Sequence, residues 1–123
     1  MIKTMCSTLL VAILLLTTSH SYANAVSADN IARGKQLWQQ KFNGKAPYQQ
    51  RSCETCHGNN LSKAGKHIRT KKLIKPMALS ANSARYTEAK KVQKWFYRNC
   101  KWTMGKTCSK QQQADILAYL KSL

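Results

Sequence analysis

The chain has few acidic residues, with 4 Asp and Glu against 21 Lys and Arg in 123 residues, and its formal net charge is +17. This imbalance excludes an acidic disordered tail and an ordinary neutral cytosolic carrier. The length excludes large catalytic scaffolds such as barrels and doubly wound dinucleotide folds. Internal repeats, low-complexity segments and strand-like alternation are also missing from the sequence. What remains is a single small domain of the all-α class.

An apolar run long enough to span a bilayer is missing as well. The longest run, Leu9 to Leu16, follows Lys3 and precedes the small residues around Ala23 and Ala25. This order is typical of a cleaved export signal, so we expect a signal peptide over 1–25 and the mature domain over 26–123. Export to a bacterial periplasm permits disulfides and argues against a nucleic-acid partner despite the basic charge. The charge also disfavours self-association, so we expect a monomer.

Apolar residues at helical spacing predict three helices in the mature chain. The first runs from about Ala28 to Phe42, the second from Glu88, with Thr87 as its N-cap, to Asn99, and the third from Lys110 to Lys121. A basic, poorly periodic stretch, 61–84, separates the first two. Ser109 and Gln112 form a capping-box pattern before the last helix.

Cys53-Glu54-Thr55-Cys56-His57 is the motif that carries chemistry. Two cysteines three apart on a helical turn can form thioethers to the vinyl groups of a haem, and the adjacent His57 can bind the iron as its proximal ligand. A thioredoxin-like redox pair would need a βαβ context, which the sequence lacks. A zinc site would need a second ligand pair at similar spacing, and Cys100 and Cys108 lie too far apart. The motif therefore predicts one covalently bound haem c.

Function depends on the ligand at the other face of the iron, for which four side chains are candidates: His67, Met77, Asn99 and Met104. Either methionine would give a low-spin electron carrier, and Met104 lies just before the last helix. Asn99 extends the apolar stripe of Val92, Trp95 and Phe96, so its amide points toward the expected core and needs a partner there. The alternative interpretation of Asn99 is a helix C-cap.

Cys100 follows Asn99 directly, and Cys108 lies just before the last helix. In an oxidising compartment these two cysteines can close a short loop. By the loop-entropy estimate the bridge would stabilise the fold by about 2.5 kcal/mol. It would also hold the end of the Asn99 helix against the start of the last helix.

The order of elements resembles class I cytochromes c, in which an N-terminal helix crosses a C-terminal one. Gly34 and Trp38 would lie at this crossing, against the face of Ile116 to Leu120. Within that class the chain resembles the SHP-type cytochromes c, which are high-spin monohaem proteins with an asparagine ligand. The matching stretches are Arg51 to Gly58, Lys63 to His67, Lys75 to Ala78, Lys91 to Cys100, Gly105, Cys108 and Ala114 to Leu120.

The resemblance implies that Cys53 and Cys56 bind the haem, that His57 and Asn99 are the axial ligands, and that Cys100 and Cys108 form a disulfide. Met104, five residues after Asn99, stays a competing distal ligand. The resemblance also implies that Asn99 leaves on reduction, so that nitric oxide, carbon monoxide or dioxygen can bind. As electron donor it suggests a dihaem cytochrome c or a membrane cytochrome b. The net positive charge favours an acidic redox partner, and a solvated basic face or anionic lipid head groups are the alternative interpretations.

Three other functions remain open at this point. A methionine-ligated electron carrier would differ in its ferric spectrum. An enzyme such as a small peroxidase or nitric oxide dioxygenase would need a distal acid–base pair that the sequence does not clearly place. A haem-free disulfide oxidoreductase would use the same two cysteines without a cofactor.

Overall fold

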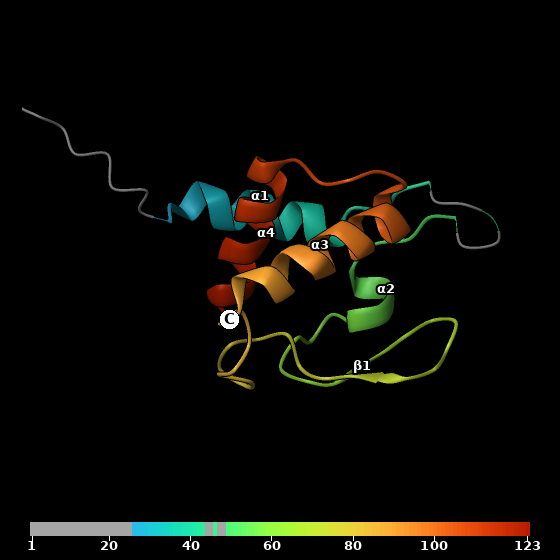
Figure 1. Ribbon diagram of the computed structural model, residues 1–123, viewed down its shortest axis with the longest axis horizontal. Helices are drawn as coiled ribbons and strands as arrows, with labels where there is room; N and C mark the ends of the chain where they lie inside the picture. The colour runs from blue at the N-terminus through green and yellow to red at the C-terminus, as the bar shows by residue number, and fades with distance from the viewer. Residues whose placement is uncertain (1–25, 44–45, 47–48) are drawn as a thin grey trace, which may run out of the picture.

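The computed structural model describes residues 26–43, 46 and 49–123, and the predicted export signal lies outside the described residues. Along the chain the elements are α1 (Ala28–Gln39), α2 (Glu54–His57), β1 (Gly65–Lys66), β2 (Leu73–Ile74), α3 (Ala89–Met104) and α4 (Lys110–Lys121). Figure 1 shows α1 and α4 crossing on one side of the molecule and the hairpin at the opposite edge. The all-α class and the crossing of the terminal helices are confirmed. The antiparallel hairpin was not predicted, because strands of two residues are too short to produce an alternating pattern.

A glycine sets the close approach of α1 and α4. A Cβ on Gly34 would lie 1.9 Å from the backbone oxygen of Asp115 and 2.9 Å from the Cβ of Tyr119. One turn later Trp38 is 4% exposed and its ring centroid lies 6.4 Å from that of Tyr119. The predicted roles of Gly34 and Trp38 are thus confirmed, with the small residue at the contact and the aromatic beside it.

The buried carboxylate of Asp115 stabilises the crossing of α1 and α4 through hydrogen bonds. Asp115 on α4 accepts hydrogen bonds from Asn30 (2.8 Å) and Gln111 (2.8 Å), and its two oxygens accept from the Arg33 guanidinium at 3.0 and 3.1 Å. The Arg33 hydrogen bond, helped by those from Gln111 and Asn30, lowers the pKa of Asp115 against the opposing effect of burial. The ionised carboxylate therefore joins α1 to α4 at neutral pH.

Three helix ends differ from the prediction. Helix α1 stops at Gln39 instead of Phe42, because Phe42 exchanges backbone hydrogen bonds of 2.8 and 3.1 Å with Arg51. Helix α3 has Glu88 as its N-cap instead of Thr87, and it continues five residues beyond Asn99. It ends at Gly105, whose φ of 75° gives the left-handed conformation that stops a helix. Helix α4 and its capping box are as predicted.

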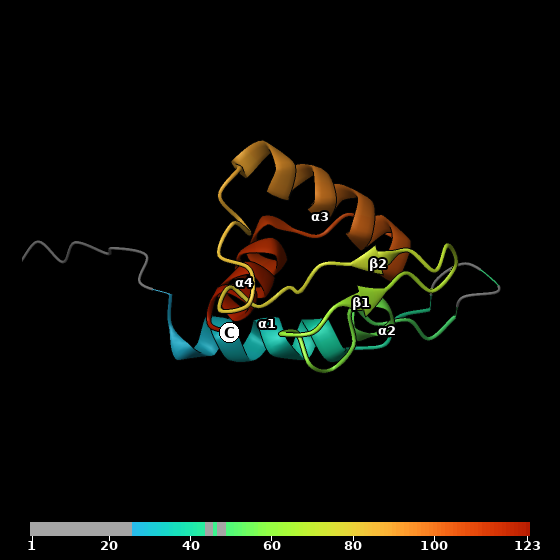
Figure 2. The same cartoon turned by 90° about the horizontal axis from the view of Figure 1, so that it is seen from below.

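The core lies where α4 meets α1, the C-terminal half of α3 and the segment that follows α2. Its buried members are Trp38, Leu61, Ala78, Cys100, Met104, Cys108, Ile116, Tyr119 and Leu120. The buried residues of α3 all lie in its C-terminal half. Figure 2 shows the N-terminal end of this helix standing away from α1 and α4. Among the described residues, none of the helices combines the length and apolarity needed to cross a bilayer.

Candidate functional site

The Cys-x-x-Cys-His motif forms the short helix α2, which backbone contacts hold against the end of α1. The Cys53 N–H donates to the Trp38 carbonyl at 3.1 Å, and the Ser52 N–H donates to the Thr55 hydroxyl at 3.0 Å. The Phe42–Arg51 bridge closes the loop that precedes the motif. Within the described chain Cys53 and Cys56 are both free thiols. The two cysteines and His57 are therefore presented together on one fixed helical turn.

The His57 imidazole is suited to bind iron. Its ring centroid lies 5.1 Å from that of Trp38, and its Nδ1 is buried without a hydrogen-bond partner among the described residues. Burial, helped by the positive charge of Arg85, lowers the pKa of His57 to about 4. The imidazole is therefore neutral at pH 7, which is the form that ligates metals.

The environment of Cys53 argues against a dithiol enzyme. Burial raises the pKa of the Cys53 thiol to about 12. Disulfide oxidoreductases need the opposite shift, because the thiolate is the attacking species. The donor set of two free thiols and one neutral imidazole fits covalent haem attachment, and the structure gives no support to the thioredoxin-like alternative.

The β1–β2 hairpin packs directly on this motif. A Cβ on Gly65 would lie 2.4 Å from the Cys56 carbonyl oxygen and 2.8 Å from the His57 Cα. The Ile68 N–H approaches the Cys56 sulfur at 3.4 Å. The hairpin therefore covers the cysteine that precedes the histidine, and only a residue without a side chain fits at position 65.

Asn99 lies in the middle of α3, so its interpretation as a C-cap is wrong. The expectation that it points into the protein core is also wrong, because Asn99 is exposed and Trp95 on the same stripe is 46% exposed. The physical reason is a rotation of the buried face, which consists of Cys100, Thr103 and Met104 with Phe96 packed beside them. Asn99 sits at the border of this face, one turn after Phe96 and one turn before Thr103.

A stack around Trp102 connects the Asn99 turn to the motif. Trp102 follows Asn99 by three residues, and the guanidinium of Arg51 lies 4.3 Å from its ring centroid. Arg51 is 4% exposed and lies two residues before Cys53. Arg69 and His67, from the hairpin turn, approach the same indole at 5.3 and 6.0 Å. The structure thus ties the segment before α2, the hairpin and the Asn99 half of α3 to one side chain.

The other three candidates for the distal ligand lie in different parts of the structure. Met104 is 8% exposed, and its sulfur lies 3.5 Å from that of Cys108 in the core. Met77 packs against the core from a loop, in which its N–H donates to the Leu61 carbonyl and its carbonyl accepts from the Tyr86 hydroxyl. The His67 Nδ1 accepts from two backbone N–H groups of its own turn, those of residues 69 and 70.

Cys100 and Cys108 form a disulfide with a Cα–Cα distance of 5.6 Å. The bridge joins α3, one residue after Asn99, to the residue that precedes the N-cap of α4. Both cysteines are buried in the core. The sequence expectation of this bridge is confirmed in the structure.

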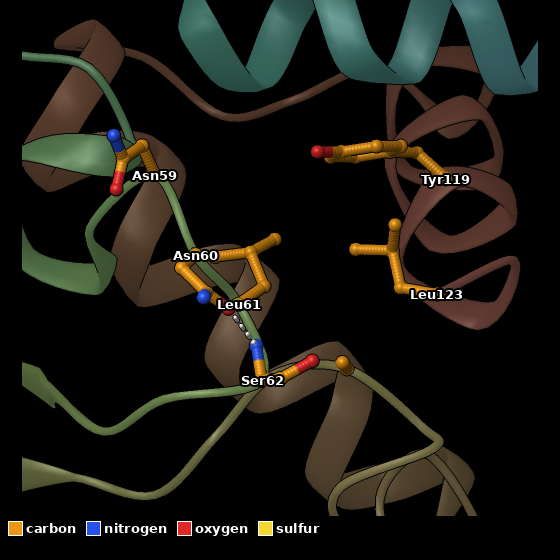
Figure 3. A pocket seen from close by; sticks show the side chains of 7 residues that line it. Asn59, Asn60, Leu61, Ser62, Tyr119 and Leu123 are labelled. Atoms are coloured by element: carbon orange, nitrogen blue, oxygen red, sulfur yellow. Dashed lines mark hydrogen bonds between the residues drawn. The ribbon is translucent and has the colours of Figure 1, made fainter.

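A pocket of roughly 530 Å³ lies between the segment after α2 and the end of α4. Figure 3 shows Tyr119 and Leu123 on one side of it, facing Asn59 to Ser62 on the other. None of the predicted haem or iron ligands lines this pocket. It is therefore a neighbour of the motif and separate from the proposed ligand positions.

Sequence reasoning missed the contact between Arg51 and Trp102 as a part of the site. Arg51 was noted only within the stretch that resembles the family. The contact between the two residues joins distant segments, and a local pattern of hydrophobicity gives no sign of it. The only available signal was the position of each residue beside a ligand candidate, two residues before Cys53 and three after Asn99.

Comparisons with known proteins agree with this arrangement. A family model described as a domain of unknown function (DUF1924) matches residues 24–120. The chain is 41% identical over 88 residues to the cytochrome c-type protein SHP of Cereibacter sphaeroides, covering 72% of this chain and 67% of the relative. It is 36% identical over 103 residues to cytochrome c'' of Methylophilus methylotrophus, covering 83% and 70%.

Solved structures show the same similarity. The structure of oxidised SHP, described as an oxygen-binding cytochrome c, superposes with a TM-score of 0.69 at 38% identity, covering 76% of this chain and 81% of that one. Oxidised cytochrome c'' from Methylophilus methylotrophus superposes with a TM-score of 0.65 at 36% identity, covering 73% and 72%.

Proposed function

This chain belongs to the SHP-type cytochromes c, and we propose that it is a periplasmic high-spin cytochrome that transfers electrons and binds a diatomic ligand when Asn99 leaves the iron on reduction. The expected family and the class I cytochrome c-like fold are confirmed, and as a member the chain carries one haem c. The export signal over 1–25, the monomeric state and the periplasmic location stay predictions. One solved relative is described as an oxygen-binding cytochrome c. This description supports a diatomic ligand such as dioxygen, nitric oxide or carbon monoxide.

In this proposal Cys53 and Cys56 hold the haem as thioethers and His57 is the proximal ligand. The free thiols on one turn and the neutral, buried imidazole of His57 support these roles. Trp38 packs on the imidazole and Gly65 allows the hairpin to close over Cys56, so the motif is fixed before the haem is attached. The haem iron, once bound, supplies the redox change and the position at which the ligand binds.

The observation that carries Asn99 as the distal ligand is the Trp102 stack. Trp102 ties the Asn99 turn to Arg51 just before the motif, while the Met104 sulfur is buried against Cys108. An amide oxygen is a hard donor, so Asn99 binds ferric iron better than ferrous iron. Asn99 lies at the border of the buried face of α3, one turn after Phe96 and one turn before Thr103, so its side chain can rotate away from the iron without displacing these packed residues.

Absorption spectra of the purified holoprotein test the distal ligand. We expect the ferric spectrum to lack the far-red methionine–iron band and the ferrous protein to bind carbon monoxide at once. Asn99→Ala should change the ferric spectrum, whereas the volume-conserving control Met104→Leu should leave it unchanged. A far-red band that disappears in Met104→Leu would instead identify an ordinary methionine-ligated electron carrier, as would its disappearance in Met77→Leu.

The cationic charge supports an acidic redox partner as electron donor, which we propose to be a dihaem cytochrome c or a membrane cytochrome b. A strong positive field accelerates encounter with an acidic surface, and salt screens this effect. We expect the rate of reduction by such a partner to fall as ionic strength rises. A rate independent of ionic strength would refute electrostatic steering.

A further inference from the structure

The outer face of the β1–β2 hairpin carries an exposed leucine surrounded by cations. Leu73 is 77% exposed, more than Val26, Trp95, Tyr97 or Leu123, the other large hydrophobic residues that stand out from the described surface. It pairs across the hairpin with Lys66, so these two side chains project from the same face. Gly65 and Ile74 form the opposite face, and Gly65 is buried against Cys56. The hairpin thus has its inner face on the haem motif and its outer face in solvent.

The charged residues of the segment around Leu73 are all cationic. Residues 58–87 contain no Asp or Glu. The lysines and arginine of this segment that lie nearest the hairpin are all exposed, namely Lys63, Lys66, Arg69, Lys71, Lys72 and Lys75. The four acidic residues of the chain lie on α1, α2 and α4 and at the start of α3. An apolar centre within a ring of one charge is complementary to an acidic protein surface with an apolar contact of its own.

The hairpin also has a short connection to the motif. The Ile68 N–H, at the start of its turn, contacts the Cys56 sulfur at 3.4 Å. Backbone hydrogen bonds of 2.9 Å between His67 and residues 71 and 72 close the turn, so the outer face is a formed surface. Figure 2 shows the two strands side by side, and Figure 1 shows β1 along the lower edge of the molecule. A partner bound to this face would be separated from Cys56, a proposed haem attachment residue, only by the hairpin itself.

We propose that the outer face of the hairpin, centred on Leu73 and Lys66, is the docking surface for an acidic redox protein. The small area suits the weak, transient complexes that electron-transfer proteins form. The lysines accelerate encounter and orient the partner, and Leu73 supplies the desolvated contact that slows dissociation. This inference rests on the proposed electron-transfer function, but it does not depend on which residue is the distal ligand.

The test is binding of the ferric holoprotein to the acidic soluble domain of cytochrome b5, measured by chemical-shift mapping and titration at low and high ionic strength. Leu73→Gln should raise the Kd about tenfold at both ionic strengths, as truncation of a central contact does. Lys66→Gln should raise it about threefold at low ionic strength and not at high. The matched controls Tyr97→Gln and Lys110→Gln, on exposed positions of α3 and α4, should leave the Kd unchanged.

Three results would overturn the proposal: shifts centred on the α3 lysines 90, 91 and 94, an unchanged Kd for Leu73→Gln, or binding only to phosphatidylglycerol vesicles. Carbon monoxide titration of ferrous Leu73→Gln separates failure of the docking surface from failure of the proposed ligand binding, and the rate of its reduction by dithionite, a small donor that needs no docking surface, separates it from failure of the proposed electron transfer. An unchanged titration with altered protein binding supports the docking surface alone. If carbon monoxide does not bind even to the wild type, the distal-ligand proposal fails and the docking result still stands.

Discussion

Removal of the Cys100–Cys108 bridge should reduce the stability of the fold by a predictable amount. The cysteines are eight positions apart, and the loop-entropy relation for this span gives about 2.5 kcal/mol of stabilisation. Both side chains are buried, and the Cys108 sulfur contacts that of Met104. Replacement of both cysteines by alanine also leaves a small cavity, which adds about 1 kcal/mol. The double variant should therefore lose about 3.5 kcal/mol in free energy of unfolding.

Urea denaturation of the ferric holoprotein, followed by far-ultraviolet circular dichroism and by the Soret band, measures this loss. Thr107→Ala, an exposed change inside the loop, is the matched control and should stay within about 0.5 kcal/mol of wild type. The slope of the free energy against urea concentration must stay the same for the comparison to hold. A double variant as stable as the control would refute the loop-entropy argument.

The same variant tests whether the bridge also positions Asn99. Because Cys100 follows Asn99 directly, loss of the bridge should loosen the proposed bond between Asn99 and ferric iron and change the ferric spectrum toward that of Asn99→Ala. A purely structural bridge would lower the free energy of unfolding and leave the spectrum of the folded protein unchanged. The two readouts therefore separate stabilisation from positioning.

Three further changes test the packing around the site. Gly34→Ala should destabilise the protein by about 1–3 kcal/mol in urea titrations despite the better helix propensity of alanine, because its Cβ would meet the Asp115 backbone at 1.9 Å. Asp115→Asn should cost about 1–3 kcal/mol at pH 7. Since Arg33 lowers the pKa of Asp115 in the folded state, this difference should hold above pH ~5 and shrink as the pH falls below ~4, where unfolded Asp takes up its proton. Gly65→Ala should shift the haem midpoint potential, measured by redox titration, because the hairpin must move off Cys56 to accommodate a methyl group; an unchanged potential would contradict the close hairpin contact.

Local signals predicted the fold well where they were strong. The capping box placed α4 correctly, and the resemblance to class I cytochromes c placed Gly34 and Trp38 at the helix crossing. The end of α3 was wrong because an asparagine was interpreted as a stop signal. The actual stop is Gly105, which adopts a positive φ, and nothing between Asn99 and Gly105 breaks a helix.

The candidate site divides in the same way. Its proximal half consists of the five consecutive residues of the Cys-x-x-Cys-His motif, which a local pattern can identify. The structure arranges Cys53, Cys56 and His57 on one turn as the motif predicts. Its distal half depends on how α3 is rotated about its axis, which long-range contacts determine. The stripe of Val92, Trp95 and Phe96 predicted one rotation, and the disulfide and the buried Met104 produce another. Hydrophobic periodicity within α3 carries no information about these long-range contacts, so it could not predict which side of the helix is buried.

This rotation has a consequence for ligand exchange. From Cys100 to Met104 the helix is fixed by the disulfide, by its buried side chains and by the Trp102 stack, whereas Trp95 one turn before Asn99 is half exposed. Asn99 therefore lies at the boundary between the packed half of α3 and its open half. A ligand that leaves from this place needs only a change of its own side-chain rotamer, because the backbone on its C-terminal side is anchored. In the proposed mechanism the fold thus separates the part of α3 that maintains stability from Asn99, the side chain proposed to leave the iron.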